Sequence, residues 1–251
     1  MTSLAAAPFI VALIALAIGL GAPAFPWAEA PSKRGRVDLA ALAGADFRRS
    51  ARQGAANGLA AGKRLVDIAA ALALVILFAP LALLLAAAIK IDGPGPVLYR
   101  QRRIGLGGKT FEILKFRSMA PDAEQDGPKW ADVNDSRVTR VGRLMRRFHL
   151  DEIPQAVNVL RGEMSFVGPR PERPEFVSVL EKEIPNYHLR HMVRPGITGW
   201  AQINYVYGAS VEDARIKLQY DLYYIQHFSL LRDILIMLLT MRVALFGLGG
   251  R

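Results

Sequence analysis

Three long runs of hydrophobic residues, at positions 4–27, 65–89 and 228–246, interrupt an otherwise mixed pattern of polar and apolar residues. The first run is long enough to cross a bilayer as a helix that rises about 1.5 Å per residue. Basic residues follow it at once, so the positive-inside rule places the N-terminus outside and the rest of the chain in the cytoplasm. We expect residues 1–30 to form a transmembrane segment, with a cleaved leader as the alternative, and residues 31–62 to form a linker.

The second run, residues 65–89, contains Pro80 near its middle and has basic residues on both flanks. A proline inside a helix removes a backbone hydrogen bond and bends or breaks the helix. A helix that crosses the membrane once would place one basic flank on the unfavoured side, whereas a helix that dips in and returns keeps both flanks on one face. The pattern favours a re-entrant helix, and a simple spanning helix is the alternative.

Shorter patterns predict the elements between these runs. Residues 97–104 and 110–119 read as two strands joined by a glycine-rich turn, which is typical of a β-hairpin. Arginines recur every three or four residues over 136–149, as on one face of a helix. The last apolar run carries charged residues, so it suits an interfacial helix. Further helices are expected over 153–160, over 172–191 with an interruption near Pro185, and over 211–226.

The composition narrows the class of partner. The net charge is +10, the isoelectric point is about 10.1 and the chain has no cysteine. Without cysteine there is no disulfide framework, no thiolate metal site and no cysteine nucleophile. A strongly basic chain suits nucleic acid, an anionic membrane surface or a phosphorylated substrate. Because the apolar runs point to a membrane and no nucleic-acid-binding motif is visible, the pattern favours a membrane and a phosphorylated substrate and predicts no nucleic acid.

The adjacent carboxylates Asp151 and Glu152 stand at the start of a helical pattern, where Pro154 fits a first helical turn. Acidic residues at a helix start commonly act only as caps and as partners of the helix dipole. Here Arg146 comes shortly before them, and Arg170 lies between two prolines shortly after them. Arginine forks suit phosphate oxygens, and one carboxylate can attack phosphorus while its neighbour holds a divalent cation. The residues therefore favour phosphate chemistry.

Several segments carry a more specific pattern. They are Lys63–Asp67, the hydrophobic run that contains Pro80, Lys115–Met119, Leu150–Glu152, Asn158–Pro171 and Arg194–Gln202. In this order, from about Lys63 to Val243, they resemble the bacterial sugar transferases, the monotopic phosphoglycosyl transferases that begin glycan assembly on polyprenol phosphate. The resemblance implies a transferase domain over residues 63–251. Its implied fold is α+β, mainly helical, and built around a re-entrant membrane helix with interfacial helices and a small β-hairpin.

The resemblance also implies a reaction and its residues. A UDP-sugar loses UMP as its sugar phosphate passes to an aspartate, and polyprenol (undecaprenyl) phosphate then takes the sugar phosphate. The family's nucleophile falls on Asp151, and its metal-binding glutamate falls on Glu152, with Mg²⁺ as the ion. The phosphate- and substrate-binding positions fall on Lys115, Arg146, Arg170 and Arg194. The reaction would be the first membrane step of exopolysaccharide or other surface glycan synthesis, at the cytoplasmic face of a bacterial inner membrane.

The chain departs from the family pattern in two places. Small members carry an arginine shortly after the Trp-Ala-Gln motif, where this chain reads Asn204–Gly208, so the resemblance assigns no residue to that contact. Small members also begin near Lys63, whereas this chain has residues 1–62 before it. A non-catalytic membrane scaffold of the same fold is the alternative function. The sugar, the polymer and the oligomeric state are left open.

Overall fold

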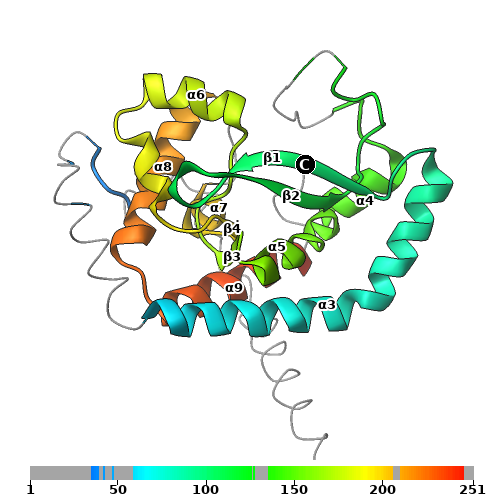
Figure 1. Ribbon diagram of the computed structural model, residues 1–251, viewed down its shortest axis with the longest axis horizontal. Helices are drawn as coiled ribbons and strands as arrows, with labels where there is room; N and C mark the ends of the chain where they lie inside the picture. Colours follow the sequence, from blue (N-terminus) through cyan, green and yellow to red (C-terminus); the bar gives the residue numbers. More distant parts are fainter. Residues whose placement is uncertain are drawn as a thin grey trace, which may run out of the picture.

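The computed structural model describes residues 35–39, 42, 47, 59–125, 127, 135–205 and 210–245, which are mainly helical with a few short strands (Figure 1). The segment predicted over residues 1–30 lies outside the described residues. In chain order the elements are α3 (Leu59–Asp92), β1 (Leu98–Ile104), η1 (Leu106–Gly108), β2 (Thr110–Phe116), α4 (Arg140–Arg147), η2 (Leu150–Glu152), α5 (Gln155–Arg161), β3 (Ser165–Val167), α6 (Pro174–Glu183), η3 (Tyr187–Met192), β4 (Gly196–Thr198), α7 (Trp200–Asn204), α8 (Val211–Gln226) and α9 (Leu230–Leu245).

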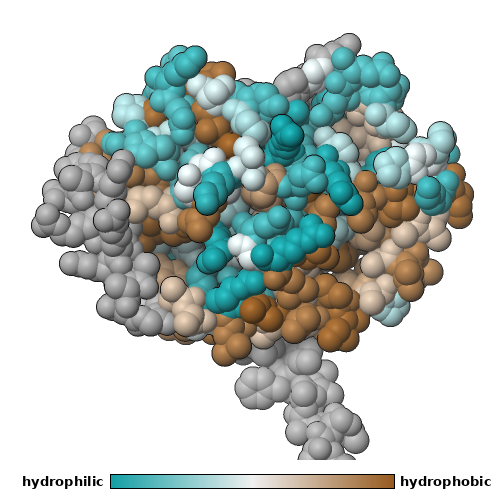
Figure 2. Space-filling view, in the orientation of Figure 1, coloured by the Kyte–Doolittle hydropathy of each residue, from teal (hydrophilic) through white to brown (hydrophobic). Residues whose placement is uncertain are grey.

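Helix α3 has 34 residues and is long and apolar enough to cross a membrane. Its alanines and leucines are strong helix formers, so the helix continues through Pro80. Figure 1 shows it running along the base of the molecule and then turning upward, a bend that a proline inside a helix accounts for. Only 11% of its most apolar stretch is buried inside the protein. Hydrophobic side chains accordingly gather along this lower edge in Figure 2.

Both ends of α3 are tied to the rest of the protein. Near its start, the ammonium of Lys63 donates to the carboxylate of Asp233 on α9 at 2.6 Å. At its end, the guanidinium of Arg117 donates to the carbonyls of Ile89 at 2.9 Å and Gly93 at 2.7 Å. Carbonyls at a helix C-terminus have no partner within the helix, so the arginine acts as a cap. The two ends of the bent helix are therefore fixed to one folded unit.

The predicted hairpin is confirmed. Strands β1 and β2 pair antiparallel, with Leu98 opposite Phe116 and Ile104 opposite Thr110. The turn between them contains η1, and Gly107 and Gly108 have φ values of 65° and 77°. Glycine suits such left-handed positions because it has no Cβ. The hairpin carries Lys115 on the strand that faces α5.

A second, parallel sheet of two strands was not predicted. Strand β3 pairs with β4, with Ser165 opposite Gly196 and Val167 opposite Thr198. Gly168 and Gly196 let the two backbones touch, because a Cβ at either position would collide with the backbone of the other segment. The sheet thus joins two segments, 165–167 and 196–198, for which the sequence pattern predicted no strand.

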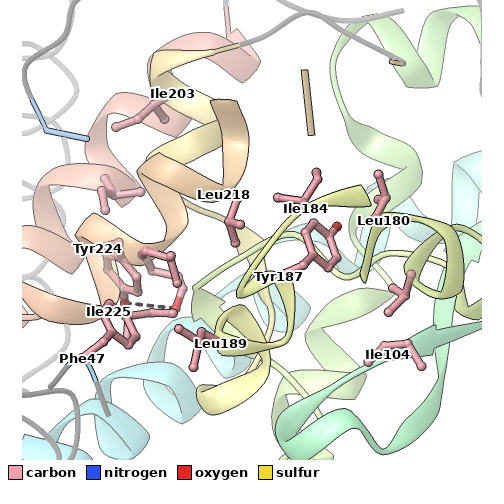
Figure 3. Packing of buried hydrophobic residues seen from close by; sticks show 14 residues of the cluster. Phe47, Ile104, Leu180, Ile184, Tyr187, Leu189, Ile203, Leu218, Tyr224 and Ile225 are labelled. Atoms are coloured by element: carbon pink, nitrogen blue, oxygen red, sulfur yellow. Dashed lines mark hydrogen bonds between the residues drawn. The ribbon is translucent and has the colours of Figure 1, made fainter. Parts of the chain in front are cut away.

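The largest buried cluster lies between α6, η3, α7, α8 and α9, and Figure 3 shows its side chains pointing toward one another. Phe47, 1% exposed, belongs to this cluster although it lies within the predicted linker. The backbone N–H of Val37 donates to the carbonyl of Gln219 at 3.2 Å, and the indole of Trp200 donates to the carbonyl of Gly35 at 3.1 Å. The described residues of this segment therefore pack against the helical core.

Candidate active site

Asp151 and Glu152 lie in η2, a single turn of 3₁₀ helix between α4 and α5. The sequence pattern placed them at the start of the α-helix itself, but α5 begins later, at Gln155. His149 causes the difference, because its φ of 56° puts it in the left-handed region and turns the chain out of α4. Asp151 is 7% exposed and Glu152 is 8% exposed, so the turn holds two adjacent carboxyl groups inside the protein.

Glu152 is held by two cations. The ammonium of Lys115 donates to Oε1 at 2.8 Å, and Arg170 donates to both carboxylate oxygens, with a distance of 3.1 Å to Oε2. Such charge-assisted, bidentate pairs fix both partners in one geometry. Burial by itself would raise the pKa of Glu152, but Arg170 and Lys115 outweigh it and hold the pKa well below its usual range. Glu152 is therefore ionised at neutral pH.

Asp151 differs from its neighbour. Within the described part of the chain, no hydrogen bond reaches its carboxylate. Burial raises the pKa of Asp151, and the nearby charge of Glu152 adds to this effect, while Lys115 and Arg146 oppose it. A buried carboxylate without hydrogen-bond donors is a stronger base and nucleophile than a solvated one. Among the described residues, the site thus combines a carboxylate held by two cations with one that accepts no hydrogen bond.

Arg170 reaches Glu152 from the loop between β3 and α6. Its side chain is 42% exposed and that of Lys115 is 18% exposed, so of the two cations on Glu152 solvent reaches Arg170 more easily. The carbonyl of Pro171 accepts from Arg103 at 3.0 Å, and the carbonyl of Arg170 accepts from Arg190 at 2.8 Å. The loop that carries Arg170 is therefore held from two sides.

The other predicted cations, Arg146, Lys115 and Arg194, have different partners and surroundings. The guanidinium of Arg146 donates to the hydroxyl of Ser118 at 3.0 Å, and its charge opposes the rise in the pKa of Asp151 that burial causes. Burial lowers the pKa of Lys115, and Glu152 opposes that shift. Arg194 is exposed and donates to the carbonyl of Gly162 at 2.9 Å, at the end of α5. The structure thus brings Lys115, Arg146 and Arg170 to the carboxylates but gives Arg194 a backbone partner instead.

The donors available for a metal ion are few. Among the residues that the structure describes, no group of three or more His, Asp or Glu side chains is arranged to hold one. Asp151 and Glu152 alone offer hard carboxylate oxygens, which suit Mg²⁺ when substrate phosphates and water supply the remaining ligands. Oε1 of Glu152 accepts from both Lys115 and Arg170, whereas Oε2 accepts from Arg170 alone, so Oε2 is the oxygen more open to an ion.

One residue that supports the site, Asn158, was not predicted to do so from the sequence. Asn158 lies in α5 and is fully buried; its amide accepts from the N–H of Leu114 at 3.0 Å and donates to the carbonyl of Glu112 at 2.7 Å. These bonds fix the strand that carries Lys115 against the helix that follows Glu152. Asn158 lies in a segment that carries the family resemblance, but only the fold reveals that its side chain meets the free edge of β2.

Comparison with known proteins shows which proteins this chain resembles. Residues 59–247 match the model of the family described as bacterial sugar transferase. The chain is 50% identical over 189 residues to the UDP-N-acetylgalactosamine-undecaprenyl-phosphate N-acetylgalactosaminephosphotransferase of Aeromonas hydrophila, covering 75% of this chain and 45% of that protein. It is 49% identical over 182 residues to the UDP-glucose:undecaprenyl-phosphate glucose-1-phosphate transferase of Caulobacter vibrioides, covering 71% of this chain and 67% of that protein.

A third relative is similar over most of its length. The exopolysaccharide production protein PSS of Rhizobium leguminosarum is 41% identical over 177 residues, which cover 68% of this chain and 88% of that protein. The matched part of the chain thus covers 45% of the Aeromonas relative but 88% of the Rhizobium relative. The family model covers about three quarters of the chain, and the chain belongs to the bacterial sugar transferase family.

Proposed function

We propose that the protein transfers a sugar 1-phosphate from a UDP-sugar to undecaprenyl phosphate and releases UMP. The observation that carries the proposal is the contrast between Asp151, which is buried without a hydrogen bond in the described structure, and Glu152, which is held by two cations. An oxygen of Asp151 attacks the phosphorus that bears the sugar, and the bond from this phosphorus to the bridging oxygen breaks. UMP leaves with the electron pair. An oxygen of the lipid phosphate then attacks the same phosphorus and releases Asp151.

The cations have a defined part in this reaction. Arg170 and Lys115 hold Glu152 in the resting site, and the partly exposed Arg170 is placed to meet an incoming diphosphate first. Movement of either cation from Glu152 to a phosphate oxygen would free the carboxylate for Mg²⁺. The ion would offset substrate charge during transfer. Burial raises the pKa of Asp151, and the charges of Lys115 and Arg146 oppose that rise and so favour the ionised carboxylate. The residues thus exchange partners when substrate binds.

The structure of α3 supports a re-entrant topology. Both ends of the helix are fixed to the same folded unit, through Lys63 at one end and Arg117 at the other. A helix that crossed the bilayer would separate these two ends by the thickness of the membrane. In the proposed arrangement α3 dips into the inner membrane and the site faces the cytoplasm. Single cysteines introduced beside Gly62 and beside Gly93 should both react with an impermeant reagent only from the cytoplasmic side, and labelling from opposite sides would refute the topology.

The reaction is tested with purified protein, Mg²⁺ and undecaprenyl phosphate. The relatives act on UDP-N-acetylgalactosamine and on UDP-glucose, so both donors are supplied. We expect UMP release with at least one of them, and without the lipid we expect a mass increase of one sugar phosphate on Asp151. Asp151→Asn should abolish both, whereas Asp122→Asn, at an exposed loop position, should abolish neither.

The outcome also separates the alternatives. A folded protein that releases no UMP from any UDP-sugar would favour the non-catalytic scaffold. Turnover without any adduct on Asp151 would mean direct transfer between the two substrates, with Asp151 as a base or metal ligand. The name of the Rhizobium relative supports a role at the first membrane step of exopolysaccharide or other surface glycan synthesis.

A further inference from the structure

A buried ion pair lies behind the loop that carries Arg170. Arg190 on η3 is 5% exposed, and Asp221 on α8 is 2% exposed. The guanidinium donates to one oxygen of Asp221 through Nε at 3.1 Å and through a terminal nitrogen at 2.8 Å. A second terminal nitrogen donates to the hydroxyl of Tyr187 at 2.7 Å. These contacts fix the guanidinium plane deep in the protein, away from the carboxylates of the site.

The same guanidinium reaches the active-site loop. One of its terminal nitrogens donates to the carbonyl of Arg170 at 2.8 Å. The loop from Gly168 to Pro171 contains two prolines and belongs to no helix or strand; Gly168 and Pro169 bond to the backbone of β4, whereas the carbonyl of Arg170 accepts from Arg190. The bond from Arg190 therefore joins a rigid helix to the backbone of the residue whose side chain holds Glu152.

Stability alone does not explain why this pair is buried. Removing two charges from water is costly, and replacing a buried ion pair with apolar side chains of similar volume often leaves stability unchanged or improved. An apolar pair cannot, however, donate a hydrogen bond in a fixed direction. An arginine held on two sides by Asp221 and Tyr187 can, because its planar fork is already oriented. The ion pair therefore fixes the position of the Arg170 carbonyl, which a hydrophobic pair could not do.

We infer that Arg190, oriented by Asp221, is a positioning residue that fixes the Arg170 guanidinium against Glu152 and the substrate phosphates. This inference rests on the proposed function, since only a phosphate substrate gives Arg170 its role. Arg190 touches no reacting atom and acts through Arg170 alone. Its loss should therefore lower kcat more than it raises the KM for the UDP-sugar. A displacement of about 1 Å in a reacting group can lower a rate about 100-fold.

The test is a double-mutant cycle. Arg190→Met combined with Asp221→Leu removes both charges and keeps the volume, and UMP release is measured with and without Arg170→Ala. We expect kcat to fall about 100-fold in the parent background and less than about threefold further in the Arg170→Ala background, because residues that act through one another are not additive. Equal losses in both backgrounds, or an unchanged kcat, would overturn the inference.

Two further variants protect the test against loss of the fold. Tyr187→Phe removes one contact of Arg190 but leaves its bond to the Arg170 carbonyl, so kcat should stay within about threefold of the parent. Arg190→Lys keeps the charge beside Asp221 but lacks the fork needed to reach both partners, so it should lose activity while the thermal midpoint stays close to the parent. A parent protein that releases no UMP contradicts the proposed function; an active parent with an equally active Arg190→Lys variant contradicts only the inference.

Discussion

Two buried amides on one face of α5 provide a direct test of how polar groups support the site. Asn158 is 0% exposed and Gln155 is 1% exposed, three residues away. Asn158 bonds to the backbone of β2, whereas neither polar atom of the Gln155 side chain has a hydrogen-bond partner in the described structure. Asn158→Leu and Gln155→Met each remove an amide and keep the approximate shape. Despite this similarity, we expect opposite effects on stability.

The magnitudes follow from the partners left behind. Asn158→Leu strands the buried N–H of Leu114, which costs about 1–3 kcal/mol, and removes the partly buried bond to the carbonyl of Glu112, which costs about 1 kcal/mol. The total of about 2–4 kcal/mol is a large share of the usual 5–15 kcal/mol of folding stability. Gln155→Met removes no bond and relieves an unpaired amide, so stability should stay the same or rise by about 1 kcal/mol.

Thermal unfolding in a single detergent provides the measurement. At about 2–4 °C per kcal/mol for a chain of this size, Asn158→Leu should lower the midpoint by at least about 5 °C. Gln155→Met should leave the midpoint unchanged or raise it slightly. If Gln155→Met destabilises the protein as much as Asn158→Leu does, burial of an amide rather than its bonding governs stability here, and the reasoning is wrong. Asn158→Leu should also lower activity, because the strand that carries Lys115 loses its contact with α5.

Three further changes test other parts of the site. Arg170→Lys keeps the charge but not the bidentate contact with Glu152, so UMP release should fall at least about tenfold; near-normal turnover would exclude a role for the fork. Burial, with the charges of Arg190 and His188 adding to it, lowers the pKa of His191 to about 4. The folded protein therefore binds a proton at His191 less readily than the unfolded chain does. The stability that the neutral ring allows is fully present above the unfolded pKa of about 6.5 and is lost as pH falls toward 4. Stability should therefore decrease by up to about 3 kcal/mol on acidification from pH 7 to pH 4, and His191→Gln should weaken this dependence in thermal melts at several pH values. His149 has a φ of 56°, so His149→Gly should unfold at or above the parent midpoint, while His149→Val should cost about 1–2 kcal/mol.

Elements with a strong local pattern could be predicted from the sequence. The hairpin and the helix over 211–226 match β1, β2 and α8 because their alternation, turn residues and caps all lie within the segment itself. The helix predicted from residue 136 begins instead at Arg140. Val138 pairs with Met119 in an isolated bridge, and Thr139 then caps the helix by accepting from the N–H of Gly142. A contact between residues 19 positions apart thus shortened an element whose own pattern was helical.

The geometry of the candidate site could not be predicted from the sequence. The resemblance implied Lys115, Arg146, Arg170 and Arg194 as phosphate-binding residues; the fold brings the first three near the carboxylates, and their roles stay predictions. The ion pairing of Glu152 with two of these cations could not be foreseen, because Lys115 lies 37 positions before it on another element. Arg190 carried no signal at all, since nothing distinguishes it among the many arginines of the sequence until the fold brings it to the loop.

The contacts that fix α3 join residues that are synthesised far apart in time. Lys63 and Asp233 are separated by 170 positions, so at about 5–20 residues per second the helix leaves the ribosome about 10–30 seconds before its partner exists. In the proposed topology the young helix therefore meets lipid with an unpaired lysine and without α9. Pro80 acts at this stage, because the bend it introduces is local and needs no partner. The late segments then contact a bent helix that its own sequence has already formed.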